Sequence, residues 1–193
     1  LRNRSSTEGV KVKAMRLLAL VIGTSVWDLI SDETFDDKFV PLVLPLVVLY
    51  LWSGSDTLQA QAAHFVKRLA LMVPSNHIFR HLSVTDELVD LNVTKALIVI
   101  IRFSDNQGAR MNATGALLNL LKTRISHFSG TQDLAFSKSI LDVPNGVQML
   151  VSASGPVSGE MSHLQRLLMD LMDKCRDKSQ VLSDAVDAAQ EEF

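Results

Sequence analysis

One apolar pattern recurs along this chain and restricts the folds that it can adopt. An apolar residue is followed, at the fourth, eighth and eleventh positions after it, by a small residue and two further apolar residues. This spacing places all members on one face of an α-helix, and the small residue lets a neighbouring helix approach closely. Copies start at residues 10, 58 and 109 and, more weakly, at 160, so successive starts lie 48, 51 and 51 residues apart. The members are Val10, Ala14, Leu18 and Val21; Leu58, Ala62, Val66 and Leu69; Ala109, Ala113, Leu117 and Leu120; Glu160, Leu164, Leu168 and Leu171.

A second apolar segment precedes each of the later copies. The segments are "FVPLVLPLVVLYLW" at 39–52, "VTKALIVIIRF" at 93–103 and, more weakly, "GVQMLVSAS" at 146–154. The first of them holds 14 residues, whereas a membrane span needs roughly 20, so we expect a buried helix. Its prolines, Pro41 and Pro45, lie near the expected first turn, where a missing N–H costs least.

Short polar connectors join the two segments of each unit and carry candidate helix N-caps. Three pairs have a serine or aspartate followed three residues later by glutamine or glutamate, the spacing of a capping box. These pairs are Asp56 with Gln59, Ser104 with Gln107, and Ser5 with Glu8. The predicted unit is therefore a helix, a tight polar turn and a second helix, repeated about every fifty residues.

This unit resembles the HEAT and armadillo repeats, whose second helix has an apolar, basic, small, apolar pattern. Lys11 and Arg110 match the basic position, whereas Gln59 and Met161 depart from it, and "ATGALLNLL" at 113–121 resembles the third helix of an armadillo repeat. The resemblance implies an all-α, right-handed superhelical solenoid of three to four helical pairs. A period longer than the roughly 40–47 residues of these families implies extended loops or an extra short helix. The expected units cover residues 1–34, 35–82, 83–130 and 131–193.

The second helices of a solenoid line one concave wall, and their faces opposite the apolar stripe predict a partner-binding surface. This surface is polar to mildly basic and suits an acidic or extended peptide, because amide and guanidinium groups donate to carboxylates and main-chain carbonyls. Its candidate residues are Lys13, Arg16, Gln61, His64, Arg68, Asn112, Asn119, His163 and Arg166. The armadillo resemblance also gives Asn119 the position of an asparagine that clamps a bound peptide's backbone. Leu20, Arg68 and Asp170 occupy this position in the other copies, so no asparagine ladder forms.

The composition and the spacing of the reactive residues predict a non-catalytic function. The five histidines have no metal-ligand spacing, no glycine-rich phosphate loop is present, and Cys175 is the only cysteine. We therefore expect no enzyme, no metal and no cofactor, and a reducing compartment inside the cell, in cytoplasm or nucleus. The net charge of −2 gives no overall basic field, so protein segments rather than nucleic acid are the expected partners. We expect a scaffold or adaptor that is part of a longer repeat protein.

Two further interpretations concern the fold. The runs ending at "LYLWSGS" and "VIIRFSDN" also suit strands of a von Willebrand factor A-like α/β domain, a ligand-binding alternative. In this alternative Ser53, Ser55 and Thr131 match that family's metal motif, but Leu51 and Ser154 replace its aspartates, so the metal site would be lost. Separately, the amphipathic end of the chain, residues 162–193, is expected to cap the solenoid, to pack on further repeats or to pair with a partner helix.

Overall fold

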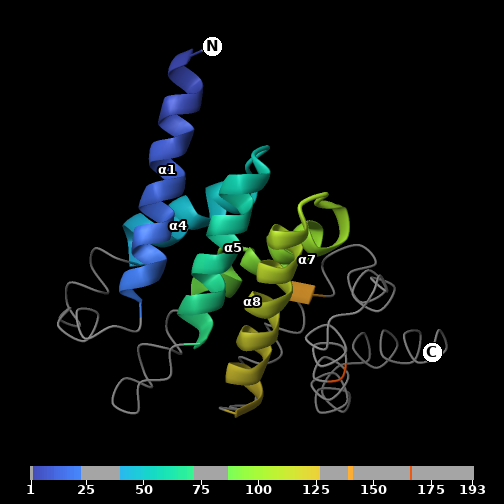
Figure 1. Cartoon of the computed structure of the whole chain (residues 1–193). Helices are drawn as coiled ribbons and strands as arrows, with labels where there is room; N and C mark the ends of the chain where they lie inside the picture. The colour runs from blue at the N-terminus through green and yellow to red at the C-terminus, as the bar shows by residue number, and fades with distance from the viewer. Residues whose placement is uncertain (1, 23–39, 72–86, 127–138, 141–165, 167–193) are drawn as a thin grey trace.

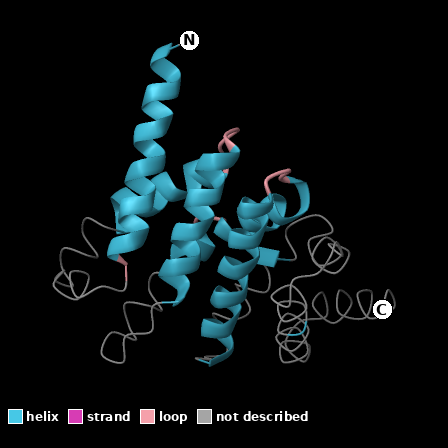
Figure 2. Cartoon of the chain, viewed as in Figure 1, coloured by secondary structure: helices cyan, strands magenta, loops and turns pink. Residues whose placement is uncertain are grey.

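The computed structural model describes residues 2–22, 40–71, 87–126, 139–140 and 166. Over these residues the secondary structure is helical, and none of it is strand (Figure 2). The helices are α1 (Arg2–Val21), α4 (Val40–Leu51), α5 (Asp56–Leu71), α7 (Val93–Phe103) and α8 (Gln107–Ser126). Most of the fourth copy, which starts at residue 160, and the segment 162–193 except Arg166 lie outside the described residues.

The apolar runs that suited strands of the α/β alternative are helices in the structure. "LVVLYL" lies in α4 and "LIVII" in α7, so these two segments contradict the sheet. Pro41 occupies the second position of α4 and Pro45 the sixth. The prediction for Pro41 is confirmed, whereas Pro45 lies inside the helix, where it removes one main-chain hydrogen bond. Both prolines are exposed.

The turn between α4 and α5 is built from serine side chains. The Ser53 hydroxyl oxygen accepts a hydrogen bond from the Ser55 N–H at 3.1 Å, which tightens the chain after α4. The Ser55 hydroxyl oxygen in turn accepts from the Leu58 N–H at 3.3 Å. Ser55 is therefore the N-cap of α5, because its side chain satisfies a main-chain donor of the first helical turn.

The turn between α7 and α8 repeats this arrangement 51 residues later. The Ser104 hydroxyl oxygen accepts from the Asn106 N–H at 3.3 Å. The Asn106 side-chain oxygen accepts from the Ala109 N–H at 3.0 Å and so caps α8. The two turns have different sequences, "SGS" and "SDN", but the same hydrogen bonds at the same offsets.

The predicted caps are therefore misplaced by one or two residues. The cap of α5 is Ser55 rather than Asp56, and the cap of α8 is Asn106 rather than Ser104. In each turn, a serine two residues before the cap accepts the N–H of the cap itself, so the helix starts later than the first polar residue suggests. Ser5 lies inside α1 and is not an N-cap.

The helices are arranged in two layers (Figure 1). α1, α5 and α8 lie side by side in one layer, and α5 contacts both of the others. α4 packs against α5, α7 packs against α8, and α4 contacts α7 in the second layer. Neighbours within a layer are thus about fifty residues apart in the chain, and neighbours between layers are joined by the short turns.

A separate helical turn at residues 87–90 comes just before α7. Asn92 follows it with φ 58° and ψ 31°, a left-handed conformation that asparagine tolerates better than most residues. Leu88 is 1% and Val89 9% exposed, so this turn belongs to the core. The long period predicted either extended loops or an extra short helix in each unit, and this helical turn is of the second kind.

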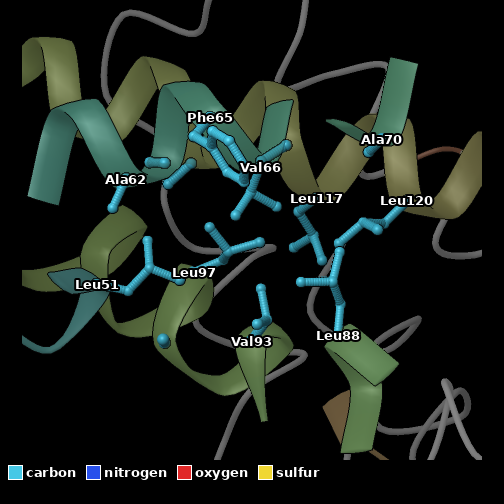
Figure 3. Packing of buried hydrophobic residues seen from close by; sticks show 14 of the residues in the cluster. Leu51, Ala62, Phe65, Val66, Ala70, Leu88, Val93, Leu97, Leu117 and Leu120 are labelled. Atoms are coloured by element: carbon cyan, nitrogen blue, oxygen red, sulfur yellow. The ribbon is translucent and has the colours of Figure 1, made fainter. Parts of the chain in front are cut away.

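One hydrophobic cluster joins both layers (Figure 3). The apolar stripes of α5 and α8 are buried as predicted, with Ala62 and Ala113 both fully covered. Leu51 of α4 and Leu97 of α7 approach these stripes from the second layer.

The stripe predicted for α1 is wrong in register. Val10 is 66%, Leu18 37% and Val21 36% exposed, and Ala14 is exposed as well. Met15 and Ala19 of α1 are buried instead, as is Ile22 directly after it. The reason is that α1 packs mainly against α5, whereas α5 packs against α1, α4 and α8.

No helix in the described ranges combines the length and the apolar character that a membrane span requires.

Candidate partner-binding surface

The structure divides the predicted surface residues by their burial. Lys13 and Arg16 on α1 are exposed, and Gln61, His64 and Arg68 on α5 are half-buried. Asn112 on α8 is half-buried, and Asn119, also on α8, is only 6% exposed. Arg166 is an exposed helical residue, and His163 lies outside the described residues.

Positive charges from two helices surround His64. The side chains of Arg68 and Lys67 lie near it on α5, and Arg16 approaches it from α1. We call Arg16, His64, Lys67 and Arg68 the basic cluster. Burial lowers the pKa of His64 below its usual 6.5, and the charges of the other three members lower the pKa further. A side-chain hydrogen bond with Asn112 of α8 acts in the opposite direction.

Arg68 also ties α5 to α1. Its guanidinium donates a hydrogen bond to the main-chain oxygen of Ile22 at 3.0 Å. This oxygen belongs to the end of α1, where carbonyl groups lack helical partners and carry partial negative charge. Arg68 therefore has a structural role besides its place in the basic cluster.

Lys67 is a member of the basic cluster that the sequence interpretation missed. Its side chain lies across Gly115 of α8, because a Cβ added to Gly115 would come within 2.5 Å of the Lys67 Cε and Nζ atoms. Lys67 is on the flank of α5 that faces α8. It therefore lies outside the face opposite the apolar stripe, which is the face that the sequence predicts to be exposed to solvent. A signal for it was available in the pairing of a lysine on one helix with a glycine at the matching level of the next.

The two asparagines of α8 bind the backbone of α5. The Asn112 amide donates to the Ala60 carbonyl at 3.1 Å, and the Asn119 amide donates to the Lys67 carbonyl at 3.0 Å. The donors are seven residues apart, as are the acceptors, so the two bonds lie two helical turns apart along the same seam. The predicted solvent exposure of Asn119 is therefore wrong: the close approach of α5 directs its amide to this protein's own main chain.

Two contacts join α1 to the α4–α5 turn and to the end of α4. The Ser55 hydroxyl donates to a Glu8 carboxylate oxygen. The Lys11 ammonium lies 5.8 Å from the centre of the Tyr50 ring, within cation–π distance. Together with the Arg68 bond, these contacts hold α1 beside α5 and so fix Arg16 near His64.

The basic cluster suits an anionic group. All the charges that act on His64 are positive, and guanidinium and ammonium groups form strong hydrogen bonds with carboxylates. Within the described ranges, no three histidine, cysteine, aspartate or glutamate side chains come together to hold a metal ion.

Comparison of the chain with protein-family models, with curated proteins and with solved structures found no match.

Proposed function

We propose that this chain is a non-catalytic scaffold of the HEAT and armadillo kind that binds acidic, extended protein segments across α1 and α5. The observation that carries the proposal is the basic cluster, in which the positive charges of Arg68, Lys67 and Arg16 act on a half-buried histidine. Such a cluster disfavours its own positive charge, so a carboxylate bound there relieves repulsion as well as forming new bonds.

The repeated architecture supports the scaffold part of the proposal. The helix pairs α4–α5 and α7–α8 have equivalent turns 51 residues apart. The first helices of the two pairs, α4 and α7, contact each other, and so do the second helices, α5 and α8. Continuation of this arrangement through the remaining units would give a right-handed solenoid with a concave wall. An intracellular compartment is part of the proposal, because Cys175 is the only cysteine.

Lys13, Arg16, Gln61 and His64 provide the contacts of the proposed surface. Carboxylates pair with the two cations of α1, and the Gln61 amide donates to a main-chain carbonyl of the bound segment. Exposed ion pairs contribute roughly 0.2–1 kcal/mol each, so several must act together. The affinity should therefore fall with rising salt.

The test is binding of a fluorescent, glutamate-rich peptide, measured by anisotropy. Lys13→Glu with Arg16→Glu reverses two charges on the surface, and Lys95→Glu with Arg102→Glu reverses two exposed charges on α7 as a matched control. Each charge-reversed contact should cost about 1 kcal/mol or more, so we expect at least a tenfold loss for the first pair. The control should change the affinity much less.

Equal losses from both pairs would indicate attraction to overall charge and contradict a defined surface. Unchanged binding in both would show that Lys13 and Arg16 do not contact the peptide, and would contradict binding across α1 and α5. Circular dichroism of both variants establishes that the helices remain formed.

A further inference from the structure

One apolar side of α1 is exposed, although the matching sides of α5 and α8 are covered. Val10 is 66% exposed, whereas its equivalents Leu58 and Ala109 are 4% and 0% exposed. Leu18 is 37% exposed, whereas both of its equivalents are fully buried. α4 packs against α5 and α7 against α8, with leucines of both approaching the stripes (Figure 3). The same residue pattern therefore receives a packed helix twice in this molecule and is open in α1.

Five exposed residues form this open side, which we call the outer face of α1. They are Val10, Ala14, Leu17, Leu18 and Val21. Because successive residues of a helix turn by roughly 100° about its axis, the five fall within about 100° of arc. This is the width of the stripe with which an amphipathic helix packs on its neighbours. Met15 and Ala19, which are buried, lie on a different side of α1.

Lysines border the outer face on both sides. By the helical period, Lys11 lies next to Leu18 on one border, and Lys13 lies next to Leu17 on the other. Both lysines are exposed, and the Lys11 ammonium also lies 5.8 Å from the centre of the Tyr50 ring. The outer face is therefore an apolar strip between two positive borders.

In α5 and α8 the equivalent border residue contacts the covering part of the chain. Gln59 and Arg110 are the equivalents of Lys11. The Gln59 amide donates to the Ser53 main-chain oxygen, just after α4, at 2.7 Å. The Arg110 guanidinium donates to the Ile101 main-chain oxygen of α7 at 3.1 Å. The border therefore takes part in holding the helix that covers the stripe, and its charge bears on which helix fits.

The charges of α1 favour an acidic occupant for the outer face. Lys11, Lys13 and Arg16 are exposed cations of this helix, and Glu8 is its only acid. The Glu8 carboxylate already accepts a hydrogen bond from the Ser55 hydroxyl. Carboxylates on a docked helix would form charge-assisted hydrogen bonds with the lysines, and complementary charge fixes both the partner and its register.

Two other occupants fit this face less well. A second copy of α1 would bring the same cations to a face that already carries them, and like charges disfavour such a pair. Helices that lie on a bilayer insert bulky aromatic and leucine side chains, whereas the outer face has no aromatic residue and has Ala14 at its middle. The alanines equivalent to Ala14, Ala62 and Ala113, are fully covered, as close helix approach requires.

We propose that the outer face of α1 is the docking site for an amphipathic helix of a partner protein. This helix presents a seam of leucine, isoleucine or valine, with aspartate or glutamate on both of its borders. The seam covers the apolar strip, and the carboxylates pair with Lys11 and Lys13. The site goes beyond the proposed function, in which an acidic segment binds in extended form near His64, and does not depend on it.

Three synthetic peptides test the proposal by isothermal titration calorimetry. The first has leucine at the seam positions of a heptad repeat and glutamate on both borders. The second has lysine in place of these glutamates, and the third has the composition of the first in scrambled order. Val10→Gln with Leu17→Gln makes the outer face polar without changing its charge. Leu42→Gln with Leu49→Gln is the matched control, because these leucines of α4 are 64% and 62% exposed.

The first peptide should bind, and the second should bind about tenfold more weakly or worse because its lysines meet those of α1. Val10→Gln with Leu17→Gln should weaken binding of the first peptide about tenfold or more, because apolar burial is lost. The α4 control should bind it as the unaltered chain does. No binding of the first peptide, equal binding of the first and second or of the first and third, or equal losses in the two variants would each overturn the proposal.

A thiol assay replaces the glutamine variants if circular dichroism shows that they lose helix. In a Cys175→Ser background the first peptide should slow labelling of Val10→Cys and leave labelling of Leu42→Cys unchanged, and equal rates with and without peptide would overturn the proposal. Concentration-dependent protection of Val10→Cys without peptide would assign the face to a second copy, and protection by phosphatidylserine vesicles but not by peptide would assign it to a membrane. Both results would also overturn the proposal.

This experiment and the test of the proposed function fail separately. The glutamate-rich peptide of the anisotropy assay has no apolar seam, and its binding reports on Lys13 and Arg16. We expect its affinity to be unchanged in Val10→Gln with Leu17→Gln. Loss of the seam peptide alone therefore contradicts helix docking on α1, and loss of the glutamate-rich peptide alone contradicts the proposed function.

Discussion

A buried asparagine must find partners for its amide, and in α8 the partners come from α5. Asn119 is 6% exposed and donates to the Lys67 carbonyl. In a solvent-facing position the same side chain would be available to a bound peptide, which is the role that the armadillo resemblance implied. The structure uses it to fix the separation and register of two helices, because an unsatisfied buried amide costs roughly 1–3 kcal/mol.

His64 is the histidine that the described part of the chain contains, and histidine changes its charge near neutral pH. Burial and the charges of Arg68, Lys67 and Arg16 lower its pKa in the folded state, so the folded chain holds this proton more weakly than the unfolded chain does. The stability that neutral His64 contributes is present above the unfolded pKa of 6.5 and is lost as the pH falls through the lower, folded pKa. Acidification thus weakens the fold at this residue.

We expect the urea unfolding midpoint to fall between about pH 7.5 and about pH 5.5, and to fall less in His64→Gln. Binding of the acidic peptide should respond in the opposite sense, becoming tighter at the lower pH because His64 gains charge beside a carboxylate. His64→Gln should remove much of that gain. An equal pH response of both proteins in both measurements would show that His64 does not titrate in this range.

Lys67 shows why sequence alone could not complete the surface. The helical period assigns each residue to a face of its own helix, but it does not say which neighbour lies against that face. Lys67 lies across Gly115, 48 residues later in the chain. Only the packing of α5 on α8 brings Lys67 and Gly115 together. The nearness of Lys67 to His64, by contrast, follows from their spacing of three residues along α5.

At the scale of elements, short turns determine where each second helix begins. Both turns use a serine to hold the N-cap residue and the N-cap to hold the helix. The apolar stripe predicted that α5 and α8 are helices, because its spacing places the four members on one face of an α-helix. It did not predict their starts, because several adjacent serine, asparagine and aspartate side chains are equally good caps until the backbone path is known.

Asn106→Ala tests the cap of α8. We expect a loss of about 1 kcal/mol in the free energy of unfolding, because the Ala109 N–H loses its acceptor at the start of the helix. Asp105→Ala changes the exposed residue just before it and should have a much smaller effect. Chemical denaturation of both variants measures the difference, and similar losses would mean that the cap is shared along the turn.

The stripe of α1 shows how far an element can be predicted in isolation. Its pattern equals that of α5 and α8, yet Met15, Ala19 and Ile22 are buried instead of the stripe. Pattern specifies which face a helix offers for burial, but the neighbours decide which face is covered. α5 contacts α1, α4 and α8, and α8 contacts α5 and α7, so the stripe of each is covered and the prediction is confirmed there.

The described helices form a chain of neighbour contacts with α5 at its centre. α5 packs against α1, α4 and α8, and Phe65 within it is fully buried. α1 packs mainly against α5, with Glu8 adding a contact to the α4–α5 turn and Lys11 one to α4. Where helices contact mainly their neighbours, a peripheral helix opens more easily than a central one.

Amide hydrogen exchange should resolve this order. We expect the amides of α1 to exchange faster than those of α5 and α8, since α1 buries one flank and they bury several. Met15→Ala removes apolar contact between α1 and α5 and should accelerate exchange in α1 alone, whereas Phe65→Ala should accelerate it throughout the described helices and cost about 3–5 kcal/mol. If Met15→Ala accelerated exchange in α8 as much as in α1, the helices would form a single cooperative unit. The chain would then lack the nearest-neighbour behaviour on which a repeat scaffold depends.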